Sequence, residues 1–102
     1  MGVESKIEAT VAEYAESLGC LHLKLLMLTT MGWPDRLFLY MGRVLFIEFK
    51  QPGERPAKIQ LWIHGKLRKH LFKVEVVDNV SQGKVYIDEL VHSNDSLDRN
   101  VP

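Results

Sequence analysis

The middle of the chain carries two short runs of aromatic and branched residues on either side of a two-residue loop. The runs cover residues 36–40 and 43–47, and the loop Met41-Gly42 offers a glycine for the positive φ of a tight turn. This pattern predicts a β-hairpin whose register is set by the loop. The expected opposite pairs are Tyr40 with Arg43, Leu39 with Val44, Leu37 with Phe46, and Asp35 with Glu48.

The second run changes from apolar to charged at its end. Residues 44–47 are apolar at every position, which is typical of a strand covered on both faces. Alternation divides the strand between two faces, with Phe46, Glu48 and Lys50 on one and Leu45, Ile47 and Phe49 on the other. Glu48 and Lys50 are therefore expected to emerge from the interior of the protein.

Two buried carboxylates that face each other need compensation, because burying an unpaired charge costs on the order of several kcal/mol. A divalent cation can bridge Asp35 and Glu48, since hard cations such as Mg²⁺ prefer carboxylate oxygens. Alternatively, the two acids and Lys50 form a structural ion cluster at the end of the strand. The hairpin alone leaves both arrangements open.

The segment before the hairpin predicts a helix and a strand. A helix is expected over residues 5–18, ended by Gly19, from the spacing of Ile7, Val11, Ala15 and Leu18. The nearly continuous apolar run 21–28 suits a central strand, and residues 29–33 form a connecting loop.

The segment after the hairpin predicts two more helices and one strand. Residues 51–55 form a turn, and Pro56 suits the first turn of a helix that runs to about His70 or Leu71. Residues 72–77 alternate as a strand, and either 78–79 or Ser81 caps a last helix that runs to about His92.

The resulting order is α-β-β-β-α-β-α, an α/β sandwich with a mixed central sheet flanked by helices. With 102 residues and 46% hydrophobic content, the chain is expected to form one domain over residues 1–92. Residues 93–102 are expected to be a polar C-terminal tail.

Two short motifs in this hairpin resemble the signature of the PD-(D/E)XK nuclease superfamily, namely Pro34-Asp35 and, after twelve intervening residues, Glu48-Phe49-Lys50. Residues 4–78 further resemble the virus-type replication-repair nuclease (VRR-NUC) domain in its stand-alone phage or bacterial type. That narrower resemblance rests on residues 32–36, strand 44–50, Pro52-Gly53, Pro56 and Gln60. It implies a restriction-endonuclease-like fold.

The resemblance also implies the roles of individual residues. Asp35, Glu48 and a glutamate of the first helix would bind Mg²⁺ or Mn²⁺, with the backbone carbonyl of Phe49 as a further ligand. Lys50 would position or deprotonate the attacking water, and Gln60 would orient Lys50 or that water. By its own chemistry, a lone helical glutamine such as Gln60 is usually a surface residue, and only the resemblance makes it a candidate.

Glu8 is the first candidate for the glutamate of the first helix. It continues the apolar stripe of that helix, which places it inward, and Glu4 on the same face is the alternative. Both could also be solvated surface acids. Three other polar or reactive residues have no motif behind them: Cys20 is expected to be buried, Trp62 to be in the core or a dimer contact, and His64 to be on the surface.

The net charge of zero hides an asymmetry along the chain. Residues 54–73 hold six bases and one acid, whereas residues 75–102 hold six acids and two bases. Such a basic segment is often only a solvated face, but beside a carboxylate metal site it is a plausible cradle for DNA. The expected DNA-binding residues are Lys24, Arg36, Arg55 and Lys58.

These observations favour a metal-dependent, structure-selective DNA endonuclease. The family resemblance suggests branched substrates such as four-way (Holliday) junctions, cleaved by a homodimer. The alternatives are a general or restriction-like nuclease, and a catalytically silent DNA-binding module with a nuclease fold. No apolar run reaches the ~20 residues of a membrane span, so a cytoplasmic protein is expected. The family resemblance implies that the cell is a bacterium or a phage-infected host.

Three features depart from the usual family pattern: Trp33 before Pro-Asp, the apolar loop 27–31, and His70 where a glycine is typical. They bear on loop shape and substrate fit, and they leave the acidic residues and Lys50 in place.

Overall fold

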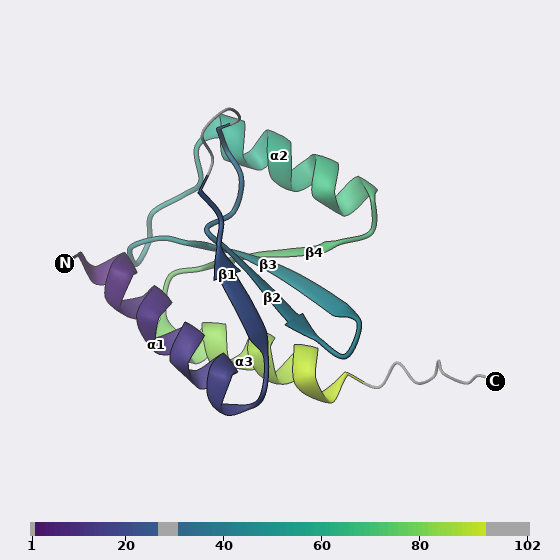
Figure 1. Cartoon of the computed structure of the whole chain (residues 1–102). Coiled ribbons are helices and arrows are strands. Elements are labelled where there is room, and N and C mark those ends of the chain that lie inside the picture. Colours follow the sequence, from purple (N-terminus) through teal and green to yellow (C-terminus); the bar gives the residue numbers. More distant parts are fainter. Residues whose placement is uncertain (1, 27–30, 94–102) are drawn as a thin grey trace.

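The computed structural model describes residues 2–26 and 31–93 as a four-stranded sheet covered by three helices (Figure 1). In chain order the elements are α1 (Val3–Ser17), β1 (Leu21–Lys24), β2 (Arg36–Tyr40), β3 (Arg43–Phe49), α2 (Lys58–Lys69), β4 (Lys73–Val77) and α3 (Val80–His92). The sheet order is β1-β2-β3-β4, antiparallel throughout except for the parallel pair β3 and β4. The predicted α/β class and order of elements are confirmed. Of the expected C-terminal tail, residues 94–102 lie outside the part of the chain that the structure describes.

The hairpin of β2 and β3 has the predicted register. Met41 and Gly42 both have positive φ, 47° and 80°, as in the type I′ turn that fits the twist of paired strands. The confirmed pairs are Tyr40 with Arg43, Leu39 with Val44, and Leu37 with Phe46. The strand pairing ends at Arg36 with Ile47, one position before Asp35 and Glu48. The backbone N–H of Asp35 donates to the carbonyl of Ile47 at 3.0 Å, which holds Asp35 beside the end of β3.

Helices cover both faces of the sheet, as Figure 1 shows. α1 and α3 lie side by side on one face, and α2 lies on the other. Alternate residues of β3 enter the two layers: Leu45, Ile47 and Phe49 pack under α1 and α3, while Phe46 packs with Ile63, Leu67 and Val74 under α2. The predicted division of β3 between two faces is therefore correct, and Glu48 lies on the α2 side.

The predicted position of the first strand is wrong. β1 covers only Leu21–Lys24 and lies at the edge of the sheet, with Leu21 and Leu23 70% and 47% exposed. Of the predicted strand 21–28 and loop 29–33, residues 27–30 lie outside the described part of the chain. The apolar run 21–28 therefore does not indicate a central strand, because β2 and β3 are the two central strands of the sheet.

The helix ends agree with their local signals to within a few residues. α1 stops before Gly19, and Asn79 caps α3 by accepting a hydrogen bond from the Gln82 N–H at 2.8 Å. α2 begins at Lys58 with Ala57 as its N-cap, so Pro56 precedes the helix instead of occupying its first turn. None of the helices within residues 2–26 and 31–93 is long and apolar enough to cross a membrane.

Candidate active site

Two mostly buried charged groups meet at the end of β3, one on the strand and one directly after it. Glu48 is only 2% exposed, although its carboxylate ends a strand of apolar residues. The side-chain ammonium of Lys50 lies 3.9 Å from Oε2 of Glu48, and 13% of its side chain is exposed. The structure therefore brings the acid and the lysine of the Glu48-Phe49-Lys50 motif together at the end of β3.

The loop before β2 brings Asp35 to the same end. Gly32 has a φ of 94°, and a Cβ at this position would lie 2.7 Å from the backbone carbonyl of Ile59, so only glycine allows the loop to approach α2 this closely. Pro34 is fully buried behind it. Oδ2 of Asp35 then accepts a hydrogen bond from the Phe49 backbone N–H at 2.7 Å. This bond fixes the carboxylate of Asp35 at the backbone of Phe49, the middle residue of the motif.

The environment of Asp35 favours its neutral form. Its pKa is raised from 3.8 to about 6, mainly by burial and also by the nearby carboxylates of Glu48 and Glu8. The hydrogen bond from Phe49 and the charge of Lys24 oppose this effect. Burial and two neighbouring acids thus disfavour the charged carboxylate of Asp35, and a bound cation would offset that effect.

Gln60 joins α2 to the acidic residue of β3. Its side-chain amide donates to Oε2 of Glu48 at 2.9 Å, and its side-chain oxygen accepts from the Ala57 backbone N–H at 2.7 Å. The structure thus places Gln60, a candidate from the resemblance, in contact with Glu48. Its contact is with Glu48, whereas the expectation was an orienting contact with Lys50 or a water.

His64 was predicted to be a surface residue, and this prediction is wrong. Its side chain is fully buried one turn after Gln60, with Nε2 3.5 Å from Oε1 of Glu48. The missed signal is the spacing of Gln60, Ile63, His64 and Leu67, which is that of one helical face. Hydrophobicity alone would instead favour an inward stripe through Ile59, Ile63 and Leu67, but Ile59 is 43% exposed.

Glu8 is buried, as predicted, but its contacts are with cations. Oε2 of Glu8 lies 2.7 Å from both Nζ of Lys24 and Nε of Arg36. Two of the four expected DNA-binding residues are therefore engaged by an acid in this structure. Within the described residues, no three His, Cys, Asp or Glu side chains are grouped closely enough to form a ready metal site.

The donor set at the end of β3 nevertheless fits a divalent cation. Oε1 of Glu48 is buried, and it has no hydrogen-bond partner among the described residues. Asp35 and Glu48 supply carboxylate oxygens, which Mg²⁺ and Mn²⁺ prefer, and repulsion between them contributes to the raised pKa of Asp35. An orphaned carboxylate oxygen beside a second acid is the observation that favours a metal over a purely structural ion cluster.

The other expected DNA-binding residues, Arg55 and Lys58, are exposed at the start of α2. Trp62 was expected in the core or in a dimer contact. At 56% exposed it is not in the core, and the dimer contact stays a prediction. The ammonium of Lys66 lies 4.2 Å from the centre of the Trp62 ring, as in a cation–π contact. The outer face of α2 therefore combines basic side chains with an exposed aromatic ring.

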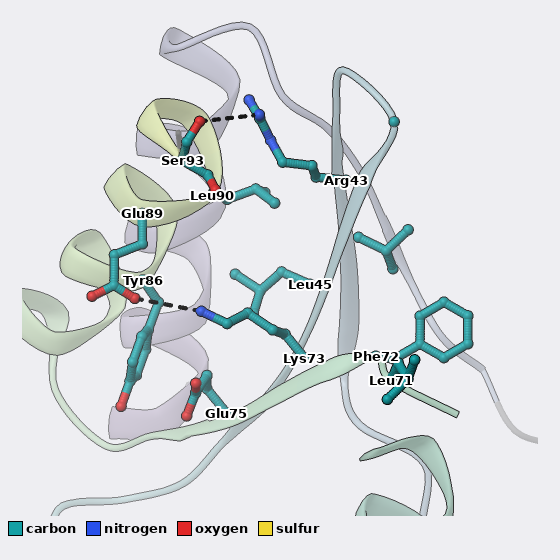
Figure 2. A pocket seen from close by; sticks show the side chains of 12 residues that line it. Arg43, Leu45, Leu71, Phe72, Lys73, Glu75, Tyr86, Glu89, Leu90 and Ser93 are labelled. Carbon is teal, nitrogen blue, oxygen red and sulfur yellow. Dashed lines mark hydrogen bonds and ion pairs between the residues drawn. The ribbon is translucent and has the colours of Figure 1, made fainter. Parts of the chain in front are cut away.

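A cavity of about 400 Å³ lies away from this site, between α3 and the start of β3 and β4 (Figure 2). Its cations are already engaged: Lys73 lies 3.8 Å from Glu89, and Arg43 donates to the backbone carbonyl of Ser93 at 3.2 Å. Val44 in its wall is roughly 13 Å from Glu48 along β3, at about 3.3 Å per residue. The cavity is therefore separate from the acidic residues and Lys50.

An α/β sandwich that gathers two acids, a lysine and a glutamine at the end of a central strand defines the restriction-endonuclease-like class of nucleases. A solved structure and a curated relative agree with this class. None of the family models compared with the chain matches it. A solved structure described as a VRR_NUC domain superposes with a TM-score of 0.79 at 31% identity, covering 86% of this chain and 97% of that one.

A curated relative from Acyrthosiphon pisum secondary endosymbiont phage 1, named "Putative nuclease p44", is 34% identical over 77 residues. The match covers 74% of this chain and 83% of the phage protein. The chain belongs to the VRR-NUC family of nucleases.

Proposed function

We propose that this protein hydrolyses phosphodiester bonds of DNA with Mg²⁺ or Mn²⁺ held by Asp35 and Glu48. The observation that carries the proposal is the buried Oε1 of Glu48, which has no hydrogen-bond partner within the described residues. The same carboxylate is close enough to Asp35 to contribute to its raised pKa. Each carboxylate oxygen can accept at two lone pairs, so Oε1 can bind a metal even when a neighbouring N–H donates to it.

Each residue of the site has a role that follows from its contacts. When bound, the divalent ion would supply an activated water and neutralise charge on the phosphate. Lys50, partly exposed at the mouth of the site, can donate hydrogen bonds to that water or to a phosphate oxygen. Gln60 holds Oε2 of Glu48, and Phe49 holds Asp35 through its N–H while its carbonyl is a candidate further ligand. The expected products carry a 5′-phosphate and a 3′-hydroxyl.

Glu8 is the proposed third acidic metal ligand. To bind the metal, it would have to give up its present contacts. Its Oε2 would have to exchange Lys24 and Arg36 for the metal. That exchange would also free two cations at the edge of the site for phosphate groups. Glu4, half-buried on the same helix, stays the alternative.

The basic outer face of α2 supports DNA as the substrate. Lys58, Lys66 and Lys69 are exposed there, the helix contains no acid, and Arg55 precedes it. Phosphate neutralisation by such residues supplies most of the sequence-independent affinity for DNA. Because Gln60 reaches Glu48 from this same helix, DNA bound along it would lie close to the acidic site.

Membership of the VRR-NUC family extends the proposal to branched DNA. We propose a preference for four-way junctions and a homodimer, since two sites related by a two-fold axis suit symmetric cleavage of such a junction. The alternatives are a general or restriction-like nuclease, and a DNA-binding module without turnover.

The test is cleavage of labelled four-way junction, splayed-arm, nicked and linear duplex DNA in Mg²⁺ or Mn²⁺, with EDTA and Asp35→Asn controls. Metal-dependent cutting of the junction alone supports the structure-selective enzyme, and equal cutting of linear duplex supports a general nuclease. Binding without cleavage supports the silent module. A monomer by light scattering at the assay concentration would contradict the homodimer.

A further inference from the structure

His64 lies beside Glu48, and its two ring nitrogens lack hydrogen-bond partners among the described residues. Its imidazole is fully buried on α2, and neither Nδ1 nor Nε2 has a hydrogen-bond partner among the described residues. The nearest carboxylate atom is Oε1 of Glu48, 3.5 Å from Nε2 and likewise without a partner. At this separation the two atoms are in the range of an ion pair and just beyond a good hydrogen bond.

Burial makes this near contact significant. Leaving a buried donor and a buried acceptor unpaired costs about as much as losing the hydrogen bond outright, so such groups are normally satisfied. A neutral imidazole with its hydrogen on Nε2 becomes a partner for Oε1 after a shift of a few tenths of an ångström. No change in the charge of His64 is required.

The position of His64 on α2 complements that of Gln60. The two residues are four apart, so they lie on the same face of the helix, and they address different oxygens of one carboxylate. Gln60 donates to Oε2 at 2.9 Å, and Nε2 of His64 points at Oε1. One face of α2 therefore approaches both oxygens of the Glu48 carboxylate.

We propose that His64 is a positioning residue that donates to Oε1 of Glu48 and, with Gln60, orients this carboxylate toward the divalent metal. The proposal rests on the metal-dependent function proposed above and adds a residue outside the motifs that define the family resemblance. Carboxylate ligands are commonly held by hydrogen bonds from neighbouring residues, and losing such a partner typically weakens metal affinity or activity 10–100-fold.

The test compares His64→Gln with His64→Met. The two replacements match in length, but only glutamine carries an N–H donor near the position of Nε2. Calorimetric titration with Mn²⁺ and the rise in melting temperature on adding Mn²⁺ measure metal binding without requiring turnover. Melting in EDTA reports on the fold alone. If His64→Met does not fold, His64→Leu replaces it in the same comparison.

We expect His64→Met to bind Mn²⁺ about 10–100-fold more weakly than the wild type, and His64→Gln to stay near the wild-type affinity. In EDTA the two variants should melt at similar temperatures. Equal Mn²⁺ affinity in His64→Met and the wild type would overturn the proposal, as would an equal loss in both variants. Wild-type protein that binds no Mn²⁺ would instead overturn the proposed metal-dependent function on which this inference rests.

Discussion

The side-chain amide of Gln60 donates a 2.9 Å hydrogen bond to Oε2 of Glu48, so a helix on one face of the sheet fixes a carboxylate at the end of a central strand. The same glutamine accepts from the backbone N–H of Ala57 and so stabilises the start of α2. One side chain therefore links the helix start to the proposed metal ligand.

Replacing Gln60 with alanine should lower activity far more than stability. We expect single-turnover cleavage to fall about 10–100-fold, because Glu48 loses a partner that orients it. The two lost hydrogen bonds should reduce the free energy of unfolding by about 1–2 kcal/mol. Leu61→Ala, at an exposed neighbouring position, is the matched control and should cleave normally. Unchanged cleavage by Gln60→Ala would show that the contact is only structural.

The raised pKa of Asp35 makes the stability of the metal-free protein depend on pH. Because the folded pKa, about 6, exceeds the unfolded value of 3.8, protonated Asp35 favours folding below pH 4, and this contribution is lost as the pH rises through 6. Asp35→Asn stays neutral and can still accept from Phe49. In EDTA it should therefore be more stable than the wild type above pH 6, by about 1–2 kcal/mol after allowing for solvent screening.

Melting curves of both proteins in EDTA between pH 3 and 8 test this expectation. The advantage of Asp35→Asn should shrink as the pH falls toward 4, and added Mn²⁺ should stabilise only the wild type above pH 6. An advantage that does not change with pH would mean that Asp35 titrates normally in the folded protein.

Lys50 should be needed for cleavage and dispensable for metal binding. Its ammonium is 3.9 Å from Glu48, so Lys50→Met removes a positive charge that competes with the metal. We expect Mn²⁺ affinity to be unchanged or tighter, while cleavage falls about 100-fold or more. Lys73→Met, at the far end of the sheet, is the control. If Lys50→Met unfolds instead, the structural ion cluster becomes the better account.

Glu8 and Glu4 can be separated as metal ligands by replacing each with glutamine. If Glu8 is the third ligand, Glu8→Gln should weaken Mn²⁺ binding about tenfold or more, and Glu4→Gln should leave it unchanged. Glu8→Gln also weakens the hold on Lys24 and Arg36, so DNA binding without metal should not decrease. The reverse pattern of Mn²⁺ affinities would assign the ligand to Glu4.

The exposed lysines of α2 should control the salt dependence of DNA binding. Replacing Lys66 and Lys69 with glutamine should weaken binding and reduce the slope of log K against log salt by about 2, roughly 0.9 per phosphate contact. Fluorescence anisotropy with Asp35→Asn as the background prevents cleavage during the titration. Lys84→Gln on α3 serves as a control. A slope that the double replacement leaves unchanged would place the DNA elsewhere.

Local signals in the sequence were sufficient for the hairpin and for the burial of Glu48. The loop at Met41-Gly42 determines the register, and the apolar run of β3 requires cover on both faces. Both inferences depend on contacts between residues that are near in sequence. For this reason the position of the acidic residues could be predicted before the packing of the helices was known.

Two errors arose where packing between distant segments decides the outcome. The apolar run after Cys20 predicted a central strand, yet β1 is an edge strand, and its sequence alone does not report how many neighbours it has. His64 lies in a basic helix with no motif around it, and its burial follows from the rotation of α2 over β3. That rotation decides whether Ile59 or Gln60 begins the face of α2 that is turned toward the sheet.

The most direct test of the account is anomalous diffraction from crystals of the protein grown or soaked with Mn²⁺. We expect one anomalous peak at the end of β3, within about 2.0–2.4 Å of carboxylate oxygens of Asp35 and Glu48, and no such peak in Asp35→Asn. A wild-type crystal with Mn²⁺ bound elsewhere, or with Lys50 still paired to Glu48 and no metal between the acids, would contradict the central claim.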